Sequence, residues 1–381
     1  MMRPVLWIAV AAAVAVLGAT APGPARATEE MIVRVAVQVD QPAVMLGADG
    51  PVQIVQTDTG SAVTLAGTAW TVTPSAGGLS IAGTAFGQTV RVSTGTGLLR
   101  IAGKPYRGTI ELQRSPQGHV TAIDELPLEA YLYGVIKGEI DPGWPPAAVQ
   151  AQAVAARTLA VERIAEVHAG VTGYDLTATT DAQVYLGASA ETPAATAAVD
   201  ATRGLLVTYQ GQPIFAAYHS NSGGHTEDSE NVWGTAYPYL RGVADPYAMS
   251  APSVNWSVTL PLGTLEATLQ RGQVQVAGLS DVSPGRVTPW GRVVTVRLTS
   301  GDGSVQEINA NRFRLLVGAG VLRSTMFTVL RDGAGEAFSG RGSGHGVGLD
   351  QWGARAMAAQ GATFDQILKF YYTGVGIDQL Y

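Results

Sequence analysis

The residue best placed for chemistry in this sequence is Glu139, which lies at the end of a stretch with helical spacing. Leu132, Val135 and Ile136 recur at three- and four-residue intervals, which indicates one buried helix face. Glu139 follows Val135 by four residues, so its carboxyl is expected on the same side. A half-buried carboxyl keeps its proton more readily, as a general acid working near neutral pH requires. The same spacing also fits a structural glutamate that bonds to nearby backbone.

Two groups of acids could supply the second carboxylate that hydrolysis of a glycosidic bond commonly uses. Asp141 is close in sequence to Glu139, but a Pro-Gly pair follows it and favours a turn in which Asp141 is a capping residue. The other group lies in a polar loop, where acids are usually solvated. Its members are Glu227, Asp228 and Glu230.

The segment 218–227 combines histidines and hydroxyl groups with glycines that would let backbone approach a ligand. A loop can bring His219 and His225 onto one metal ion, but a closed zinc site usually needs four ligands and Glu227 would give only three. Ser222 could be a nucleophile beside a histidine, although the nucleophile-elbow pattern is missing. Metal binding by His219 and His225 is therefore the weaker hypothesis for this segment.

A third segment, 340–348, has glycine at every second position around His345. It is neither a Walker loop nor the start of a dinucleotide-binding unit. In an extended strand, this pattern would leave one face without side chains, able to accept a flat sugar ring or a packed helix. Aromatic residues gather near all three segments and could stack on sugar rings or simply form core. They are Trp144, Tyr218, Trp233, Tyr237, Tyr239, Trp352, Tyr371 and Tyr372.

The start of the chain predicts export. Arg3 precedes an uncharged apolar run over residues 5–19, and Ala-Arg-Ala at 25–27 is a small-x-small cleavage pattern. The run is shorter than the roughly 20 residues of a spanning helix, so we expect a signal peptide over 1–27, no stable transmembrane domain after cleavage, and a secreted, periplasmic or wall-associated protein.

Composition narrows the classes of function. The chain has no cysteine, which excludes disulfides, thiol catalysis and cysteine-based metal sites. Its formal net charge is -6 and only 14% of residues are charged, so no basic surface is available to bind nucleic acid. A neutral polymer or a wall polysaccharide suits such a chain better.

The elements that would position these residues indicate an α+β fold. Short runs of Val, Ile and Thr between glycine turns predict a β-rich N-terminal domain over 28–122, in which Val33 to Val39 alternates like a half-buried strand. The remainder, 123–381, has helical spacing, with a slim alanine-rich helix from Pro146 to about His168. Within it, residues 251–330 read as a β-rich insertion or subdomain. Thr363 to Gln366 is a capping box that opens a last helix.

Three long blocks of the sequence, in order, resemble the stage II sporulation protein D family, also called the amidase-enhancer family, of exported peptidoglycan-active proteins. They are ELPLEAYLYGVIKGEIDPGWPPAAVQAQAVAART, YHSNSGGHTEDSENVWGTAYPYLRGVADPY and GRGSGHGVGLDQWGARAMAAQGATFDQILKFYYTGV. The preceding YRGTIELQ also looks like the segment before the catalytic block in relatives.

This resemblance implies a helical catalytic core and the activity of a lytic transglycosylase, with Glu139 matching the family's catalytic acid. Such an enzyme cleaves the β-1,4 bond between N-acetylmuramic acid and N-acetylglucosamine, preferably in peptide-free glycan, and leaves 1,6-anhydro ends. One carboxyl can act first as acid and then as base. The alternative is a non-catalytic glycan-binding protein that stimulates a cell-wall amidase. The partners implied are peptidoglycan glycan strands and, in the alternative, that amidase.

The resemblance also suggests which residues bind substrate. His219, Ser222, His225, His345 and Gln351 would line the cleft, with Tyr239 and Trp352 as stacking surfaces. Family members often carry cysteine in the block that here reads HSNSGGH, and zinc is associated with it in some of them. Ser222 stands where that cysteine is common, so we expect no cofactor, and zinc is a doubtful ligand here.

Overall fold

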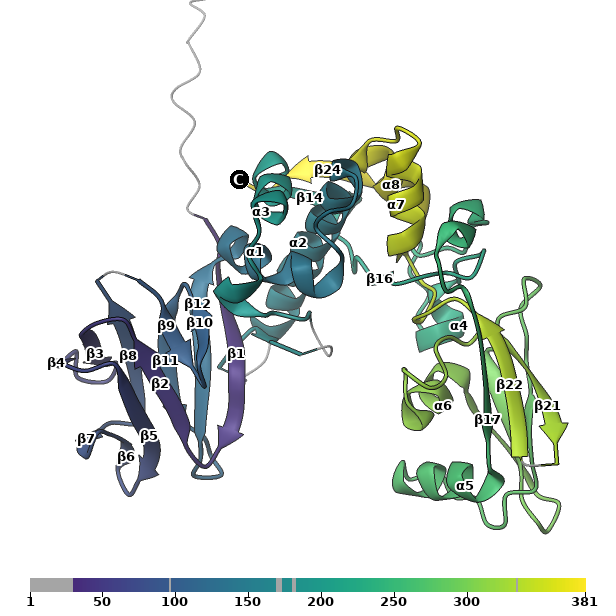
Figure 1. Ribbon diagram of the computed structural model, residues 1–381, viewed down its shortest axis with the longest axis horizontal. Helices are drawn as coiled ribbons and strands as arrows, with labels where there is room; N and C mark the ends of the chain where they lie inside the picture. The colour runs from purple at the N-terminus through teal and green to yellow at the C-terminus, as the bar shows by residue number, and fades with distance from the viewer. Residues whose placement is uncertain (1–29, 96, 169–172, 180–182, 334) are drawn as a thin grey trace, which may run out of the picture.

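The computed structural model describes residues 30–381 except 96, 169–172, 180–182 and 334. The expected signal peptide, 1–27, lies outside the described residues. Figure 1 shows three parts side by side: β-sheets from the N-terminal third, a group of helices in the middle, and a second β-rich part from the green segment of the chain. The α+β class is confirmed. No helix in the described part of the chain is long and apolar enough to cross a membrane.

The N-terminal part consists of two sheets packed on a common apolar core. The predicted alternating strand forms β1, in which Val33 and Val35 are fully buried. The first sheet has the order β13 (Leu176–Thr177), β1 (Ile32–Gln41), β12 (Val120–Pro127), β11 (Thr109–Arg114), β8 (Thr89–Thr94), β3 (Val52–Gln56) and β4 (Ala62–Leu65). The second has the order β10 (Lys104–Tyr106), β9 (Leu99–Ile101), β2 (Val44–Ala48), β5 (Ala69–Ser75), β6 (Gly78–Ile81) and β7 (Thr84–Phe86).

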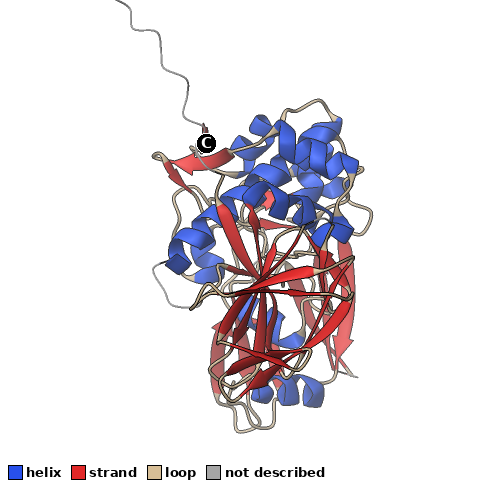
Figure 2. Ribbon diagram, turned by 90° about the vertical axis from the view of Figure 1, so that its left-hand side faces the viewer, coloured by secondary structure: helices blue, strands red, loops and turns tan. Residues whose placement is uncertain are grey.

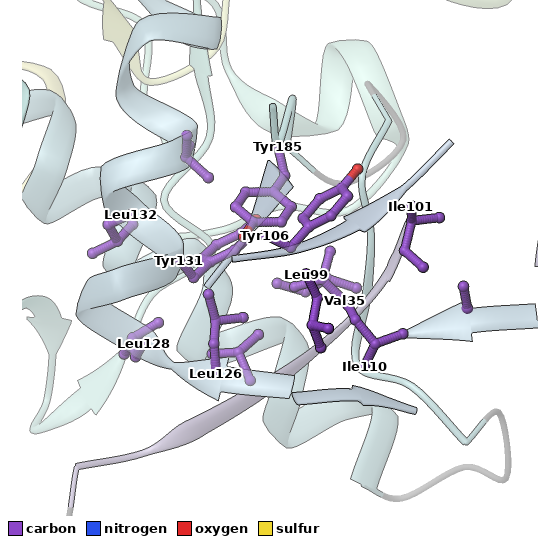
Figure 3. Close-up of a cluster of buried hydrophobic side chains, with 14 of the residues drawn as sticks. Val35, Leu99, Ile101, Tyr106, Ile110, Leu126, Leu128, Tyr131, Leu132 and Tyr185 are labelled. Carbon is purple, nitrogen blue, oxygen red and sulfur yellow. The ribbon is translucent and has the colours of Figure 1, made fainter. Parts of the chain in front are cut away.

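The last strand of this part, β12, leads directly into helix α1 (Leu128–Glu139). The boundary expected at residue 122 therefore falls inside a strand, and the strand belongs with its sheet. Pro127 is the N-cap of α1, next to the first helical turn as its fixed φ favours. Leu128 and Tyr131 on α1 join the same buried cluster as the strand residues Val35 and Ile110 (Figure 3). The helix that carries Glu139 is thus fixed to the sheets by a shared core.

The alanine-rich segment forms a central helix, α2 (Pro146–His168), as predicted. Ala151 and Ala155 are fully buried, and their small side chains let neighbouring helices approach closely. The helices of the middle part gather at one end of the sheets in Figure 2. The elements packed most closely on α2 are α1, α3 (Pro193–Ala201), α7 (Gln351–Ala359), α8 (Phe364–Tyr371) and β14 (Leu205–Tyr209). The predicted capping box at the start of α8 is confirmed.

The β-rich insertion extends further than the predicted 251–330. Its first sheet pairs β17 (Asn255–Leu260) with β22 (Gly335–Arg341) and β22 with β21 (Phe327–Asp332), so the insertion continues to residue 341. Phe313 and Phe338 are fully buried in its core. The other elements are α5 (Leu262–Arg271), β18 (Asp281–Pro284), β19 (Thr295–Thr299), β20 (Val305–Asn309) and α6 (Ala310–Val317).

The chain enters the β-rich insertion and leaves it at adjacent points, where the N–H of Gly342 donates to the carbonyl of Val254 at 2.8 Å. The backbones of Asn221 and Ser343 exchange two hydrogen bonds of 2.9 and 2.8 Å. Beside them, β16 (Tyr218–His219) pairs in parallel with β23 (Leu349–Asp350). The two histidine-containing segments singled out in the sequence are therefore neighbours in space.

Candidate functional site

Glu139 is the last residue of α1 and is partly buried. Its Oε1 accepts a hydrogen bond of 2.9 Å from the backbone N–H of Val184. The carboxyl also hydrogen-bonds to the Tyr218 hydroxyl. The stripe on α1 thus places the acid as the spacing predicts, and two segments distant in sequence fix its orientation.

Gln183 donates a hydrogen bond to the Tyr218 hydroxyl and so leaves that hydroxyl to act as a donor. The Gln183 side-chain Nε2 donates to the Tyr218 hydroxyl at 3.0 Å and to the carbonyl of Ala156 at 3.2 Å. Its Oε1 accepts from the hydroxyl of Tyr131 at 3.1 Å. Because the Tyr218 oxygen already accepts from Gln183, its own hydrogen is available for the Glu139 carboxyl.

Two glycines in α1 let the segment 183–187 lie against the helix. An added Cβ at Gly138 would meet the carbonyl oxygen of Val184 at 2.6 Å, and one at Gly134 would meet the ring of Tyr185 at 2.5 Å. Both contacts are shorter than ordinary packing allows. Glycine at these positions is therefore what lets the Val184 amide reach Glu139.

Burial raises the pKa of Glu139, while its hydrogen bonds with Val184 and Tyr218 act in the opposite direction. The C-terminal end of a helix is the negative end of its dipole, which also disfavours a carboxylate there. The result is an acid that holds its proton to higher pH than an exposed glutamate. Such a group suits general acid catalysis.

Glu139 lies where two hollows in the protein surface meet, since it lines both. The first, which we call the arginine hollow, has a volume of about 470 Å³ and contains the side chains of Arg163, Trp233, Arg314 and His345. The second, which we call the tryptophan hollow, has a volume of about 440 Å³. Its lining includes Lys137, Asp141, Trp144, Gln351 and Trp352.

Three of the residues expected to bind substrate line these hollows. His345 lines the arginine hollow, and Gln351 and Trp352 line the tryptophan hollow. The rings of Trp144 and Trp352 lie 4.9 Å apart between centroids. The guanidinium of Arg355 lies 5.2 Å from the Trp352 ring. This packing fixes two indoles beside Glu139.

His345 is a neutral side chain in this position. Its Nδ1 accepts from the backbone N–H of Val347 at 3.1 Å, so Nε2 carries the hydrogen and donates to the carbonyl of Tyr218 at 2.9 Å. Burial, with smaller contributions from the charges of Arg314 and Arg292, lowers the pKa of His345 to about 4. It therefore positions the Tyr218 strand and carries no positive charge near neutral pH.

Four other expected substrate residues have structural contacts instead. Ser222 is fully buried and its hydroxyl donates to Asp245 at 2.9 Å, so it holds the loop. His219 is buried against the carbonyl of Val347, and its ring lies beside that of His345. His225 stacks on the ring of Trp290 at 4.2 Å. The hydroxyl of Tyr239 accepts from the backbone of Phe215.

After the end of β22 at Arg341, the glycine-rich segment is a folded loop, which corrects the prediction of an extended strand with one bare face. Gly342, Gly344, Gly346 and Gly348 all have positive φ, between 69° and 106°, a region that other residues rarely adopt. At Gly346 an added Cβ would also lie 2.4 Å from the buried Arg292 guanidinium. The glycines are needed for the path of the loop, which places His345 in the arginine hollow.

The other candidate carboxylates have structural partners. Asp141 is exposed and accepts from the N–H of Gly143 at 2.9 Å, the predicted turn. Glu227 is fully buried, which corrects the expectation of a solvated loop acid. Its Oε2 accepts from the Trp290 indole at 2.7 Å and lies 3.7 Å from Arg292. Glu230 pairs with Arg241 at 2.6 Å. Among the acids that line the hollows, Glu139 is the buried one and Asp141 the exposed one.

The residues do not fit the zinc site of some family members. His219 and His225 contact different groups, and the Ser222 hydroxyl is committed to Asp245. Across the described ranges, no three His, Asp or Glu side chains gather in the manner of a metal site.

No pattern in the sequence marks Arg163, Gln183 or Arg314 as residues near Glu139. Gln183 and Arg314 are brought to Glu139 by chain segments 44 and 175 residues downstream of it. No local periodicity marks such contacts. The one sequence signal for the hollows was the set of aromatic residues near the three blocks. Three of its members line the hollows: Trp144, Tyr218 and Trp233.

Comparison with known proteins agrees with the resemblance in the sequence. The family model described as stage II sporulation protein matches residues 116–209, which contain Glu139. Stage II sporulation protein D of Bacillus subtilis is 32% identical over 275 residues, covering 68% of this chain and 76% of that protein. An uncharacterized protein of Brachyspira hyodysenteriae is 36% identical over 255 residues, covering 67% of each chain.

A further relative is the amidase enhancer of Bacillus subtilis, which is 31% identical over 290 residues. The match covers 64% of this chain but only 39% of that longer protein. With a sporulation protein D relative above 30% identity that is matched over three quarters of its length, the chain belongs to the stage II sporulation protein D family.

Proposed function

We propose that this protein is a peptidoglycan lytic transglycosylase in which Glu139 acts first as acid and then as base. The observation that supports the proposal most directly is a single partly buried carboxyl, with a raised pKa, at the junction of two hollows. A glycan strand could place one sugar in each hollow, with the bond between them at Glu139. The neighbouring indoles of Trp144 and Trp352, which are tilted by 52° relative to each other, suit the apolar face of a sugar ring.

The chemistry needs no second carboxylate and no water. Glu139 donates its proton to the glycosidic oxygen as the bond from C1 of N-acetylmuramic acid to that oxygen breaks. The resulting carboxylate then takes the proton of the muramic 6-hydroxyl as O6 bonds to C1. The products are a free 4-hydroxyl on N-acetylglucosamine and a 1,6-anhydro ring, and Glu139 is again protonated.

The residues around Glu139 support both steps. The hydrogen bonds from Val184 and Tyr218 stabilise the carboxylate after the first proton transfer, while burial favours the acid before it. Neither group needs to move between the steps. The site is therefore preorganised for a proton that leaves and returns.

The test is the mass of the products from peptide-free glycan. Wild-type protein should release fragments with 1,6-anhydromuramic ends, and Glu139→Gln should release none. The control variant Glu307→Gln, which changes an exposed acid of the insertion, should behave as wild type. Ordinary reducing ends would instead identify a hydrolase, with Asp141 as the acid to examine next.

Such an activity places the protein outside the cytoplasmic membrane, at the cell wall. Export through the predicted signal peptide agrees with this location. Detection of the mature protein in the wall or periplasmic fraction, with its N-terminus after Ala27, would test it.

A second candidate function is stimulation of a cell-wall amidase without cleavage of glycan. The similarity to a relative named amidase enhancer favours it. Purified protein that binds glycan strands and releases no fragments, and that behaves identically as Glu139→Gln, would support this alternative. A loss of product in Glu139→Gln alone would exclude it.

A further inference from the structure

Arg314 is a buried cation in the wall of the arginine hollow. It lies on α6 of the β-rich insertion and is only 7% exposed. Its Nε donates to the carbonyl of Arg323 at 3.1 Å, and its Nη1 lies 3.4 Å from the side-chain oxygen of Asn311. The insertion thus contributes a charged group to the hollow that Glu139 lines.

This guanidinium has no carboxylate partner in the described part of the chain, unlike the two other arginines buried to the same degree. Arg157 pairs with Glu129 at 2.7 Å, and Arg292 lies 3.7 Å from Glu227. Glu139, the one acid lining the arginine hollow, forms no salt bridge with Arg314. Removing a charge from water without a partner is costly, so the position is suited to an anion that arrives with the ligand.

The ligand expected at Glu139 offers one such anion. Each N-acetylmuramic acid carries a lactyl group, whose carboxyl is an amide where a stem peptide is attached and a free carboxylate in peptide-free glycan. A guanidinium matches a carboxylate through two parallel N–H donors. An amide at the same place would have no charge and one oxygen fewer to accept.

Resting on the proposed function, we propose that Arg314 is the specificity-determining residue that binds the free lactyl carboxylate of N-acetylmuramic acid in the arginine hollow. It recognises glycan from which the stem peptide has been removed. The β-rich insertion then selects the substrate, while α1 supplies the acid.

The experiment changes the ligand and the residue in parallel, in a Glu139→Gln background that binds without cleaving. The probes are peptide-free glycan strands and the same strands with their lactyl carboxyls converted to methylamides, and binding is measured by calorimetry. Conversion to methylamides should weaken binding about 10- to 100-fold, as expected for a charge-assisted hydrogen-bonded pair.

In the same background, Arg314→Met should bind the carboxylate strands as weakly as the methylamide strands and no longer distinguish them. Arg297→Gln, an exposed arginine of the same insertion, should retain the discrimination. Equal binding of both strands by the parent would overturn the proposal. So would an Arg314→Met protein that still distinguishes them.

These readouts do not depend on catalysis, so they remain decisive if the protein proves to be a binding protein only. Circular dichroism and thermal unfolding establish whether Arg314→Met is folded. If it is not, equal binding of the two strands by the parent still overturns the proposal.

Discussion

Replacing Gly138 with alanine tests whether the Val184 amide controls the acid. The added Cβ would lie 2.6 Å from the Val184 carbonyl oxygen, which must retreat by roughly 0.8 Å to reach the 3.4 Å at which ordinary contact begins. The neighbouring N–H now donates to Glu139 over 2.9 Å, and a bond lengthened by that amount is no longer a hydrogen bond.

The magnitude follows from the type of bond lost. A hydrogen bond to a charged group contributes about 1.5–3 kcal/mol, so kcat for glycan cleavage should fall about 10- to 100-fold. Loss of a donor to the carboxylate also raises the pKa of Glu139, so the decline of activity at high pH should move to higher pH. Alanine is a better helix former than glycine by up to about 1 kcal/mol, which offsets part of this loss in the free energy of unfolding.

The assay is release of anhydro ends across a pH series, with urea unfolding measured on the same samples. The matched control is Gly263→Ala on α5, where an added Cβ meets nothing within 4 Å and activity should not change. A folded Gly138→Ala protein with kcat and pH profile of wild type would refute the role given to Val184.

Three further outcomes follow from the same contacts. Tyr218→Phe removes the other hydrogen-bond donor to the Glu139 carboxylate, so activity should fall about tenfold and its decline at high pH should shift to higher pH. A decline at the same pH as in wild type would contradict this. Trp352→Ala should raise KM for glycan about tenfold by removing a stacking surface, with kcat less affected, and a change confined to kcat would argue against stacking. Burial and the adjacent Asp245 raise the pKa of Asp350, so the folded state binds this proton more tightly than the unfolded state does. The stability gained from the proton is fully present below the ordinary aspartate pKa and is lost as pH rises through the raised pKa. Asp245→Asn should reduce this loss of stability in urea unfolding measured from pH 5 to 8.

The helices could be predicted from the sequence because their signals are local. The stripe on α1, the alanine-rich α2 and the capping box at Thr363 each follow from spacing within a few turns. The position of Glu139 on its helix was predictable for the same reason. Its hydrogen-bond partners were not, because Val184 and Tyr218 reach it only through tertiary packing.

The loops were predicted less well because glycine can serve either close packing or a positive φ angle, and because polar residues can be buried. Alternating glycine fits a bare strand face, but four positive φ angles show that backbone conformation requires it here. Likewise, Ser222 and Glu227 look solvent-facing in a polar segment, yet both are fully buried in hydrogen-bond networks. The polarity of a segment does not show whether a distant residue will pair with it in the interior. Asp245 does so for Ser222, and Arg292 lies beside Glu227.

The hydrogen bond from the N–H of Gly342 to the carbonyl of Val254 joins the two ends of the β-rich insertion. Because the chain departs and returns at neighbouring points, the entropy of closing the intervening segment grows only slowly with its length. Residues could therefore be gained, lost or exchanged within the insertion over evolutionary time without disturbing α1. In a family with this architecture, the insertion can change substrate selection while α1 keeps Glu139 in the same position.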